Sequence, residues 1–152
     1  PQRLKPQPYA RPLGFADGRA CRKGDAMNSV EQIATDKAPG AVGPYSQALA
    51  VGGLVFTSGQ LPINPETKAM PQDVAAQAAA SLKNVQAVLE AAGSSMGKVL
   101  KTTVYLTDIN DFAAINEVYA TFFKPPFPAR SCFAVKSLPL NAKIEIEAVA
   151  AR

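Results

Sequence analysis

Residues 127–151 read Phe-Pro-Ala-Arg-Ser-Cys-Phe-Ala-Val-Lys-Ser-Leu-Pro-Leu-Asn-Ala-Lys-Ile-Glu-Ile-Glu-Ala-Val-Ala-Ala and contain two strand-like runs joined by a Pro/Asn loop. Arg130 interrupts the first run, and Glu145 and Glu147 interrupt the second. Charged side chains are rarely buried without a partner, because removing a guanidinium or a carboxylate from water is costly. These three residues therefore indicate either a structural ion pair or a binding site for a small charged molecule.

The alternation of side chains along a strand assigns each of these residues to a face. Arg130 shares a face with Cys132, and Glu145 shares a face with Glu147, opposite the two isoleucines of its run. If the isoleucines fill the core, the glutamates face solvent or a boundary between subunits. Two interpretations remain open: an ion pair of Arg130 with one of the glutamates, or a bidentate clamp on a substrate carboxylate, which the planar guanidinium suits.

The composition of the 152 residues, 47% hydrophobic and 18% charged, is typical of one soluble globular domain with its own core. The formal charge of +4 comes from residues 1–26, which hold six basic and two acidic residues, whereas residues 27–152 hold ten of each. A neutral domain gives no electrostatic argument for a phosphate partner, so we expect no nucleic acid. No apolar run approaches the roughly 20 residues of a membrane helix, so we expect no membrane span.

The sequence contains no histidine, which is the commonest general base and the commonest metal ligand. This excludes Ser-His-Asp, Cys-His and histidine-based zinc chemistry. The two cysteines, Cys21 and Cys132, make no disulfide framework, and a reducing compartment is the simpler assumption. Without a histidine to activate its thiol, Cys132 is interpreted as a small hydrophobic residue rather than a nucleophile.

The chain divides into a leading segment, residues 1–26, and a single domain, residues 27–152. The leading segment has four prolines, scattered arginines and glycines, and almost no apolar periodicity, so we expect it to be disordered. It is rich in arginine and poor in acidic residues, as transit peptides are, but it contains no serine. We expect it to be irrelevant to the function and the protein to be cytoplasmic, or organellar if this segment is a remnant of a targeting signal.

Within the domain, short runs with strand character are predicted at residues 30–35, 47–51, 54–58 and 99–107, in addition to the two runs described above. Gly52-Gly53 lies between the second and third of these runs and signals a two-residue hairpin. The Gly/Pro-rich loop at residues 38–47 can hold Tyr45 in a fixed place, although Tyr45 can also simply cover the edge of the core. Ser58 ends a strand, where a serine either serves a site or caps the backbone.

Two helices are predicted between the strands. The first spans residues 72–92, with an apolar stripe, a cap at Asp73 and a terminating Gly93. The second begins at Asn110 or Asp111, has apolar residues at 112, 115, 119 and 122 on one side, and stops before two prolines at 125 and 126. Helices that alternate with strands and pack on one face of a mixed six-stranded sheet form a two-layer α+β sandwich.

Five segments of the domain form a recognisable pattern: Gly43-Pro-Tyr-Ser-Gln47, Leu54-Val-Phe-Thr-Ser-Gly-Gln60, Lys101-Thr-Thr-Val-Tyr105, Phe127-Pro-Ala-Arg-Ser131 and Lys143-Ile-Glu-Ile-Glu-Ala148. Together they closely resemble the RidA family, also called YjgF. The likeness runs from about residue 27 to residue 152, and the spacing of the last two segments is its most specific part.

The resemblance implies a chorismate-mutase-like α+β fold that assembles as a homotrimer with equivalent clefts between the subunits. It also implies an enzyme, a 2-iminobutanoate/2-iminopropanoate deaminase, that needs no cofactor and no metal. Such an enzyme hydrolyses 2-aminoacrylate and other 2-iminoacids to 2-oxoacids and ammonia. Its small-molecule substrates are released by pyridoxal-phosphate enzymes that act on serine or threonine.

The resemblance further implies roles for individual side chains. Arg130 would clamp the substrate carboxylate, Glu145 would position and activate water or pass it a proton, and Tyr45 would close the pocket from its loop. The residues that would line the pocket are Ser58, Gly59, Asn116 and Cys132. An iminium carbon is already electrophilic, so a held carboxylate and one placed water supply much of what hydrolysis needs. Glu147 is left as an ordinary solvated residue.

Two other functions stay open from the sequence. The first is an RNA-cleaving translation inhibitor, against which the neutral domain and the missing histidine argue. The second is a non-catalytic binding or holdase protein that captures small acids in its cleft. Turnover of an imine separates the deaminase from both.

Overall fold

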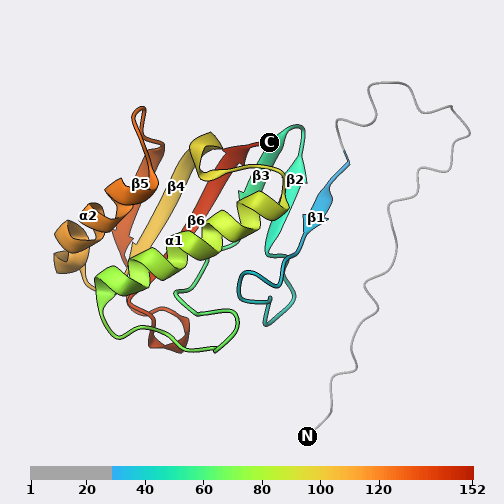
Figure 1. Ribbon diagram of the computed structural model, residues 1–152. Coiled ribbons are helices and arrows are strands. Elements are labelled where there is room, and N and C mark those ends of the chain that lie inside the picture. Colours follow the sequence, from blue (N-terminus) through green and yellow to red (C-terminus); the bar gives the residue numbers. More distant parts are fainter. Residues whose placement is uncertain (1–28) are drawn as a thin grey trace, which may run out of the picture.

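The computed structural model describes residues 29–152, which form a six-stranded sheet with two helices on one of its faces (Figure 1). The strands are β1 Glu31–Ile33, β2 Ala48–Val51, β3 Leu54–Thr57, β4 Val99–Leu106, β5 Ala129–Ala134 and β6 Ile144–Ala151. The helices are α1 Val74–Ala91 and α2 Phe112–Phe122, with 3-10 turns η2 Met96–Lys98, η3 Ile109–Asp111 and η4 Pro139–Asn141. The α+β fold expected from the sequence is confirmed, whereas the predictions for residues 1–26, Cys21 included, lie outside the described residues.

The last strand of the chain lies inside the sheet. The strand order is β1-β2-β3-β6-β4-β5, in which only β4 and β5 are parallel. Ile144 and Ile146 of β6 are fully buried beneath the helices, and Glu145 and Glu147 project from the opposite face. The predicted split of this strand into an apolar and an acidic face is therefore confirmed.

The hairpin predicted at Gly52-Gly53 joins β2 to β3, with Val51 paired to Leu54 across the turn. Both glycines have left-handed backbone angles, with φ of 57° and 80°. A two-residue turn of this kind matches the twist of the flanking strands and requires residues that tolerate positive φ.

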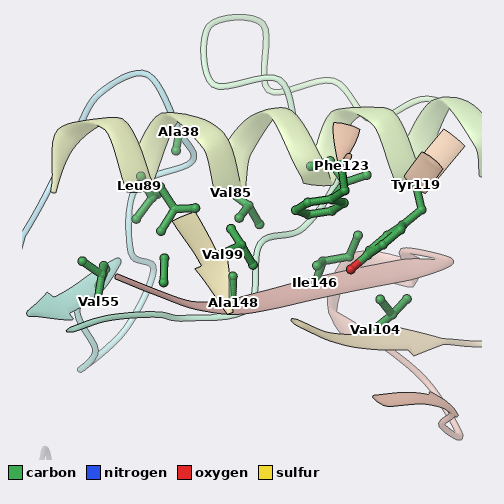
Figure 2. Close-up of a cluster of buried hydrophobic side chains, with 14 of the residues drawn as sticks. Ala38, Val55, Val85, Leu89, Val99, Val104, Tyr119, Phe123, Ile146 and Ala148 are labelled. Atoms are coloured by element: carbon green, nitrogen blue, oxygen red, sulfur yellow. The ribbon is translucent and has the colours of Figure 1, made fainter. Parts of the chain in front are cut away.

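The helix α1 packs its apolar stripe flat against the sheet (Figure 2). Leu82, Val85 and Leu89 are completely buried. The carboxylate of Asp73 accepts a hydrogen bond of 2.8 Å from the amide of Ala76, which caps the first turn as expected. Past the other end, Gly93 has a φ of 76°, as a C′ glycine should.

The helix α2 begins where it was predicted to begin, but its first turn is not capped in the expected way. Asp111 occupies the N-cap position but its side chain makes no capping hydrogen bond. The capping carboxylate belongs to Asp108, which accepts from the amide of Asn110 at 2.9 Å, because the turn η3 precedes the helix and moves its entry upstream. The inner side of α2 buries Ile115 and Tyr119 as predicted.

The face of the sheet that the helices leave uncovered is called the open face below. The strand register places on it Leu49, Phe56, Lys101, Thr103, Tyr105, Phe133, Glu145, Glu147 and Val149. Within one chain Leu49, Phe56 and Phe133 of this face are 41%, 43% and 54% exposed. No helix among the described residues is long and apolar enough to cross a membrane.

Candidate active site

Arg130 and Glu145 lie on opposite faces of the sheet. Thr102 of β4 is the partner of Arg130 on β5, and Tyr105 of β4 is the partner of Glu145 on β6. Paired residues share a face, and positions 102 and 105 of one strand have opposite orientations. In addition, β4 separates the other two strands. The interpretation that Arg130 forms an ion pair with Glu145 or Glu147 of its own chain is therefore wrong. Among residues 29–152 the ion pair that is found joins Arg152 to Glu31.

The guanidinium of Arg130 stacks on two aromatic rings of α2. Its carbon lies 4.6 Å from the ring centre of Tyr119 and 5.4 Å from that of Phe112. The Tyr119 hydroxyl is 2.8 Å from the hydroxyl of Thr102 in a buried hydrogen bond, which holds the ring in place. Burial raises the pKa of Tyr119, so its hydroxyl stays protonated. Stacking orients the guanidinium while its N–H groups remain available to an acid.

Asn116 and Cys132 accompany Arg130. Asn116 follows Phe112 by four residues and precedes Tyr119 by three, a spacing that places all three on one side of α2. Cys132 lies two residues beyond Arg130 on the same face of β5 and packs partly buried against the core. Burial raises the pKa of its thiol, although the charge of Arg130 opposes this effect. Its contact with the core supports the interpretation of Cys132 as a packing residue. We call Arg130, Asn116 and Cys132 the arginine half.

The other predicted residues line one cleft. A hollow of about 510 Å³ is bordered by Tyr45, Ser58, Gly59 and Glu145, which we call the glutamate half. The rest of its wall is largely apolar, with Pro39, Val42, Leu61, Ile63, Pro139 and Leu140. A cleft with apolar walls and a few converging polar groups is the usual form of a small-molecule site.

The carboxylate of Glu145 rests directly on the backbone of Gly59. A Cβ atom built on Gly59 would lie 1.9 Å from Oε1 of Glu145, so no other residue fits beneath the carboxylate. Glu145 is half-buried, and this burial, together with the charge of Glu147, raises its pKa above the ordinary value of 4.5. A carboxyl group of this kind exchanges protons closer to neutral pH than an exposed one does.

Tyr45 and Ser58 are held by backbone groups. The amide of Val42 donates to the Tyr45 hydroxyl at 3.3 Å, so the phenol lies across its own loop. The Ser58 hydroxyl donates to the carbonyl of Ser46 at 2.6 Å, and the Ser58 amide donates to the carbonyl of Gln47 at 2.9 Å. Ser58 thus ties the Tyr45 loop to the end of β3, which agrees with the capping interpretation of this serine.

Several residues that shape the glutamate half were missed in the sequence. The buried side chain of Gln47 accepts from the amide of Thr35 and donates to the carbonyls of Thr35 and Pro39, at 2.7 to 2.9 Å. The hydroxyl of Ser81 donates to the carbonyl of Gln60, one residue beyond Gly59. A usable signal existed, because polar residues at positions 77, 81 and 84 recur at helical spacing beside the apolar stripe of α1.

Within one chain the arginine half and the glutamate half therefore lie on opposite faces of the sheet and do not meet. The predicted residues lie close together within each half, but the sheet separates the two halves. Among residues 29–152 no three His, Cys, Asp or Glu side chains are grouped so that they could hold a metal ion. The expected independence from metals and cofactors stays a prediction.

By its architecture the chain is a two-layer α+β sandwich with a cleft at one end of the sheet and a stacked arginine at its β5 edge. Residues 35–152 match the family described as Endoribonuclease L-PSP. The chain belongs to this family, which is the RidA (YjgF) family, and the resemblance seen in the sequence is confirmed.

Named relatives are similar over nearly their whole length. The RutC family protein y4sK of Sinorhizobium fredii is 57% identical over 121 residues, which cover 79% of this chain and 96% of that protein. The 2-iminobutanoate/2-iminopropanoate deaminase of Escherichia coli is 54% identical over 123 residues, with the same coverage. The names of such relatives agree with the expectation of an enzyme.

Solved structures of similar proteins also match this chain over nearly their whole length. The crystal structure of E. coli TdcF with bound serine has a TM-score of 0.77 and 52% identity, covering 80% of this chain and 98% of that chain. RidA from an Antarctic Psychrobacter has a TM-score of 0.78 and 45% identity, covering 80% of this chain and 99% of that chain.

Proposed function

We propose that this chain is a deaminase that hydrolyses 2-aminoacrylate and other reactive 2-iminoacids to 2-oxoacids and ammonia, and that it acts in the cytoplasm. The observation that carries the proposal is a pair of matched groups: a stacked, exposed arginine without an acidic partner among residues 29–152, and a half-buried glutamate in an apolar-walled cleft. A relative that is 54% identical and bears the name of this activity supports it.

We further propose that the site is completed between copies of the chain in a homotrimer. The arginine half and the glutamate half lie on opposite faces of one sheet, so one chain cannot present both to a small acid. The open face exposes Leu49, Phe56 and Phe133, and monomeric proteins rarely leave such large apolar side chains uncovered together. Closed cyclic assembly buries the same surface on every copy and forms equivalent sites.

In the proposed mechanism Arg130 binds the substrate carboxylate through two parallel hydrogen bonds, with Tyr119 and Phe112 fixing the plane of the guanidinium. Asn116 and Cys132 border the bound acid beside Arg130. This clamp fixes the distance between the imine carbon of the substrate and the glutamate half of a neighbouring copy. Because the bound substrate is already oriented, the reaction step loses much less entropy than the same reaction in solution.

Hydrolysis then requires one water and one proton carrier. Ionised Glu145 takes a proton from a water held over Gly59, and the oxygen of that water bonds to the imine carbon of the protonated imine. The carbon–nitrogen double bond becomes single, and the proton passes from Glu145 to the amine. Ionised Glu145 then takes the proton of the hydroxyl group as the carbon–nitrogen bond breaks, and the carbonyl re-forms. Ammonia leaves with that proton, so one protonated imine and one water give one 2-oxoacid and one ammonium ion, and Glu145 is ionised again. Tyr45 and Ser58 fix the loops that border this water, and the raised pKa of Glu145 suits both proton transfers.

The proposal is tested by generating 2-aminoacrylate with a serine dehydratase and following the release of pyruvate. We expect the wild-type chain to accelerate this release and Arg130→Ala to lose roughly 100-fold or more of the acceleration. Arg130→Lys should recover only part of it, because a lysine keeps the charge but not the planar fork. Lys83→Ala, which removes an exposed cation of α1, serves as the matched control. Unchanged activity in Arg130→Ala, or no acceleration by the wild type, contradicts the proposal.

The same preparation separates the alternatives. Cleavage of RNA that survives repurification and is abolished by Glu145→Ala would favour the activity that the description of the family names. Binding of 2-oxoacids without turnover of any imine would favour a binding protein.

A further inference from the structure

Two residues beside Glu145 have so far no part in the function. Tyr105 is the direct partner of Glu145 across the antiparallel pair β4 and β6, and Glu147 follows Glu145 by two residues on the same face. Directly opposed residues have Cβ atoms about 5 Å apart, and i, i+2 neighbours on one face are about 7 Å apart. The three side chains therefore form one group on the open face, next to the cleft of the glutamate half.

A hydrogen bond connects two members of this group. The hydroxyl of Tyr105 donates to Oε1 of Glu147 at 3.2 Å, across the diagonal of the pair of strands. Burial and then the charge of Glu147 raise the pKa of Tyr105, so the phenol keeps the proton that it donates. An otherwise flexible glutamate side chain is thus fixed over the sheet instead of extending into solvent.

The other charged groups near Glu145 do not neutralise the carboxylate of Glu147. Lys101 of β4 borders a small hollow with Glu147 but forms no ion pair with it. Lys143 precedes β6, and its ammonium group donates to the carbonyl of Gln72 at 2.9 Å. Tyr45 in the cleft is occupied by its own loop. Within the described residues, the carboxylate of Glu147 is therefore the charge that acts on Glu145 from its own strand.

We propose that Tyr105 and Glu147 are positioning residues for the reaction: the hydroxyl of Tyr105 holds the Glu147 carboxylate beside Glu145, and the fixed negative charge sets the pH at which Glu145 becomes the ionised base. The inference rests on the proposed function in that Glu145 activates water. Glu147 is then a tuning group rather than an ordinary solvated residue.

The direction of each effect follows from electrostatics. Two carboxylates that share a site hinder each other's ionisation, so removing the charge of Glu147 makes Glu145 easier to ionise. Glu147→Gln keeps the size of the side chain and removes that charge. Tyr105→Phe keeps the ring and frees the Glu147 carboxylate to turn away from Glu145, which weakens the same repulsion by a smaller amount. Both variants move the titration of Glu145 in one direction, toward lower pH.

The first measurement needs no activity. The full chain is labelled with ¹³C at the glutamate carboxyl carbons, and the signal that disappears in Glu145→Gln identifies Glu145. We expect its titration midpoint to move to lower pH in Glu147→Gln and, by a smaller amount, in Tyr105→Phe. Glu66→Gln removes an exposed carboxylate from a loop and should leave the midpoint unchanged. An unchanged midpoint in Glu147→Gln overturns the inference, and an unchanged midpoint in Tyr105→Phe alone overturns the part assigned to the tyrosine.

The second measurement connects the group to catalysis through the pH dependence of kcat/KM for a 2-iminoacid. The acidic limb should move to lower pH in both variants, so that the ratio of kcat/KM at pH 5 to that at pH 7.5 rises roughly threefold in Glu147→Gln. A merely structural role would lower kcat/KM at every pH without moving this limb, and that outcome would overturn the inference. If no form of the chain hydrolyses imines, the proposed function fails, while the carboxyl titration still decides whether Glu147 controls Glu145.

Discussion

Gly59 and Glu145 set the tightest constraint at the scale of single residues. The carboxylate occupies the space that any side chain at position 59 would take, since a Cβ there would lie 1.9 Å from Oε1. Gly59→Ala must therefore displace the carboxylate. Misplacement of a catalytic group by about 1 Å costs on the order of 100-fold in rate.

We therefore expect Gly59→Ala to lose about 100-fold in kcat while the chain stays folded. The measurement is the dehydratase-coupled assay together with circular dichroism. Gly97→Ala is the control, because a Cβ at Gly97 meets nothing closer than 3.9 Å. Equal activity of Gly59→Ala and the wild type would show that the position of this carboxylate does not matter.

The raised pKa of Glu145 also makes a prediction about stability. Below its unfolded value of about 4.5 the carboxyl is protonated in both states and has no effect. As the pH rises through the higher pKa of the folded state, the carboxylate ionises in a half-buried place beside Glu147, and the folded state loses stability. Glu145→Gln should therefore raise Tm at pH 7.5, by roughly 2 °C, and by less at pH 4.

Thermal unfolding at the two pH values, at one protein concentration, tests this expectation. Glu66→Gln should show no such dependence on pH. A gain in Glu145→Gln that is larger at pH 4 than at pH 7.5 would have the wrong sign for a carboxyl whose pKa is raised in the folded state.

At the scale of elements, α1 does more than cover the sheet. Its buried Asn84 donates to the carbonyls of Leu61 and Ile63 at 2.8 and 2.9 Å, and Ser81 holds the carbonyl of Gln60. The segment that leaves β3 has no ladder partner of its own beyond the bridge of Gln60 to Ile146. The helix therefore fixes one wall of the cleft through side chains instead of through strand pairing.

Asn84→Ala should remove the donor for both carbonyls and lower the free energy of unfolding by about 1–3 kcal/mol. Urea unfolding measures this change. Gln86→Ala on the exposed side of the same helix removes only a surface contact with Glu90 and should cost under about 0.5 kcal/mol. Similar values for the two variants would mean that the segment does not depend on α1.

Local signals were enough to predict most elements. Gly52-Gly53 specifies its hairpin because both positions need positive φ, and Asp73 and Gly93 mark the ends of α1 because each satisfies backbone groups there. The faces of β5 and β6 were also predictable one strand at a time. Their relative phase was not, because it depends on how both strands register with Val104, which pairs with Cys132 on one side and Ile146 on the other.

That phase decides how the molecule can work as a whole. Had Arg130 and Glu145 shared a face, an ion pair or a site within one chain would have remained open. Their placement on opposite faces leaves each half with groups that suit a bound acid but, within residues 29–152, without the other half on the same face. If the site is shared between copies, each copy needs to supply only one intact half to a given site. Mixing two variants that each lack a different half tests this requirement.

Arg130→Ala and Glu145→Gln should each be inactive alone and should restore activity when they are unfolded together, mixed in equal amounts and refolded. Random assembly gives about a quarter of the sites one copy with an intact Arg130 and a neighbour with an intact Glu145, so about a quarter of wild-type activity is expected. Mixing Glu145→Gln with Gly59→Ala, which both damage the glutamate half, should restore nothing. Mass spectrometry of the intact assembly confirms that mixed species form. If mixed assemblies form but show no activity, an intact Arg130 on one copy does not work with an intact Glu145 on its neighbour. The register of β4, β5 and β6 separates the two residues within one chain, so this outcome would contradict a site that combines them.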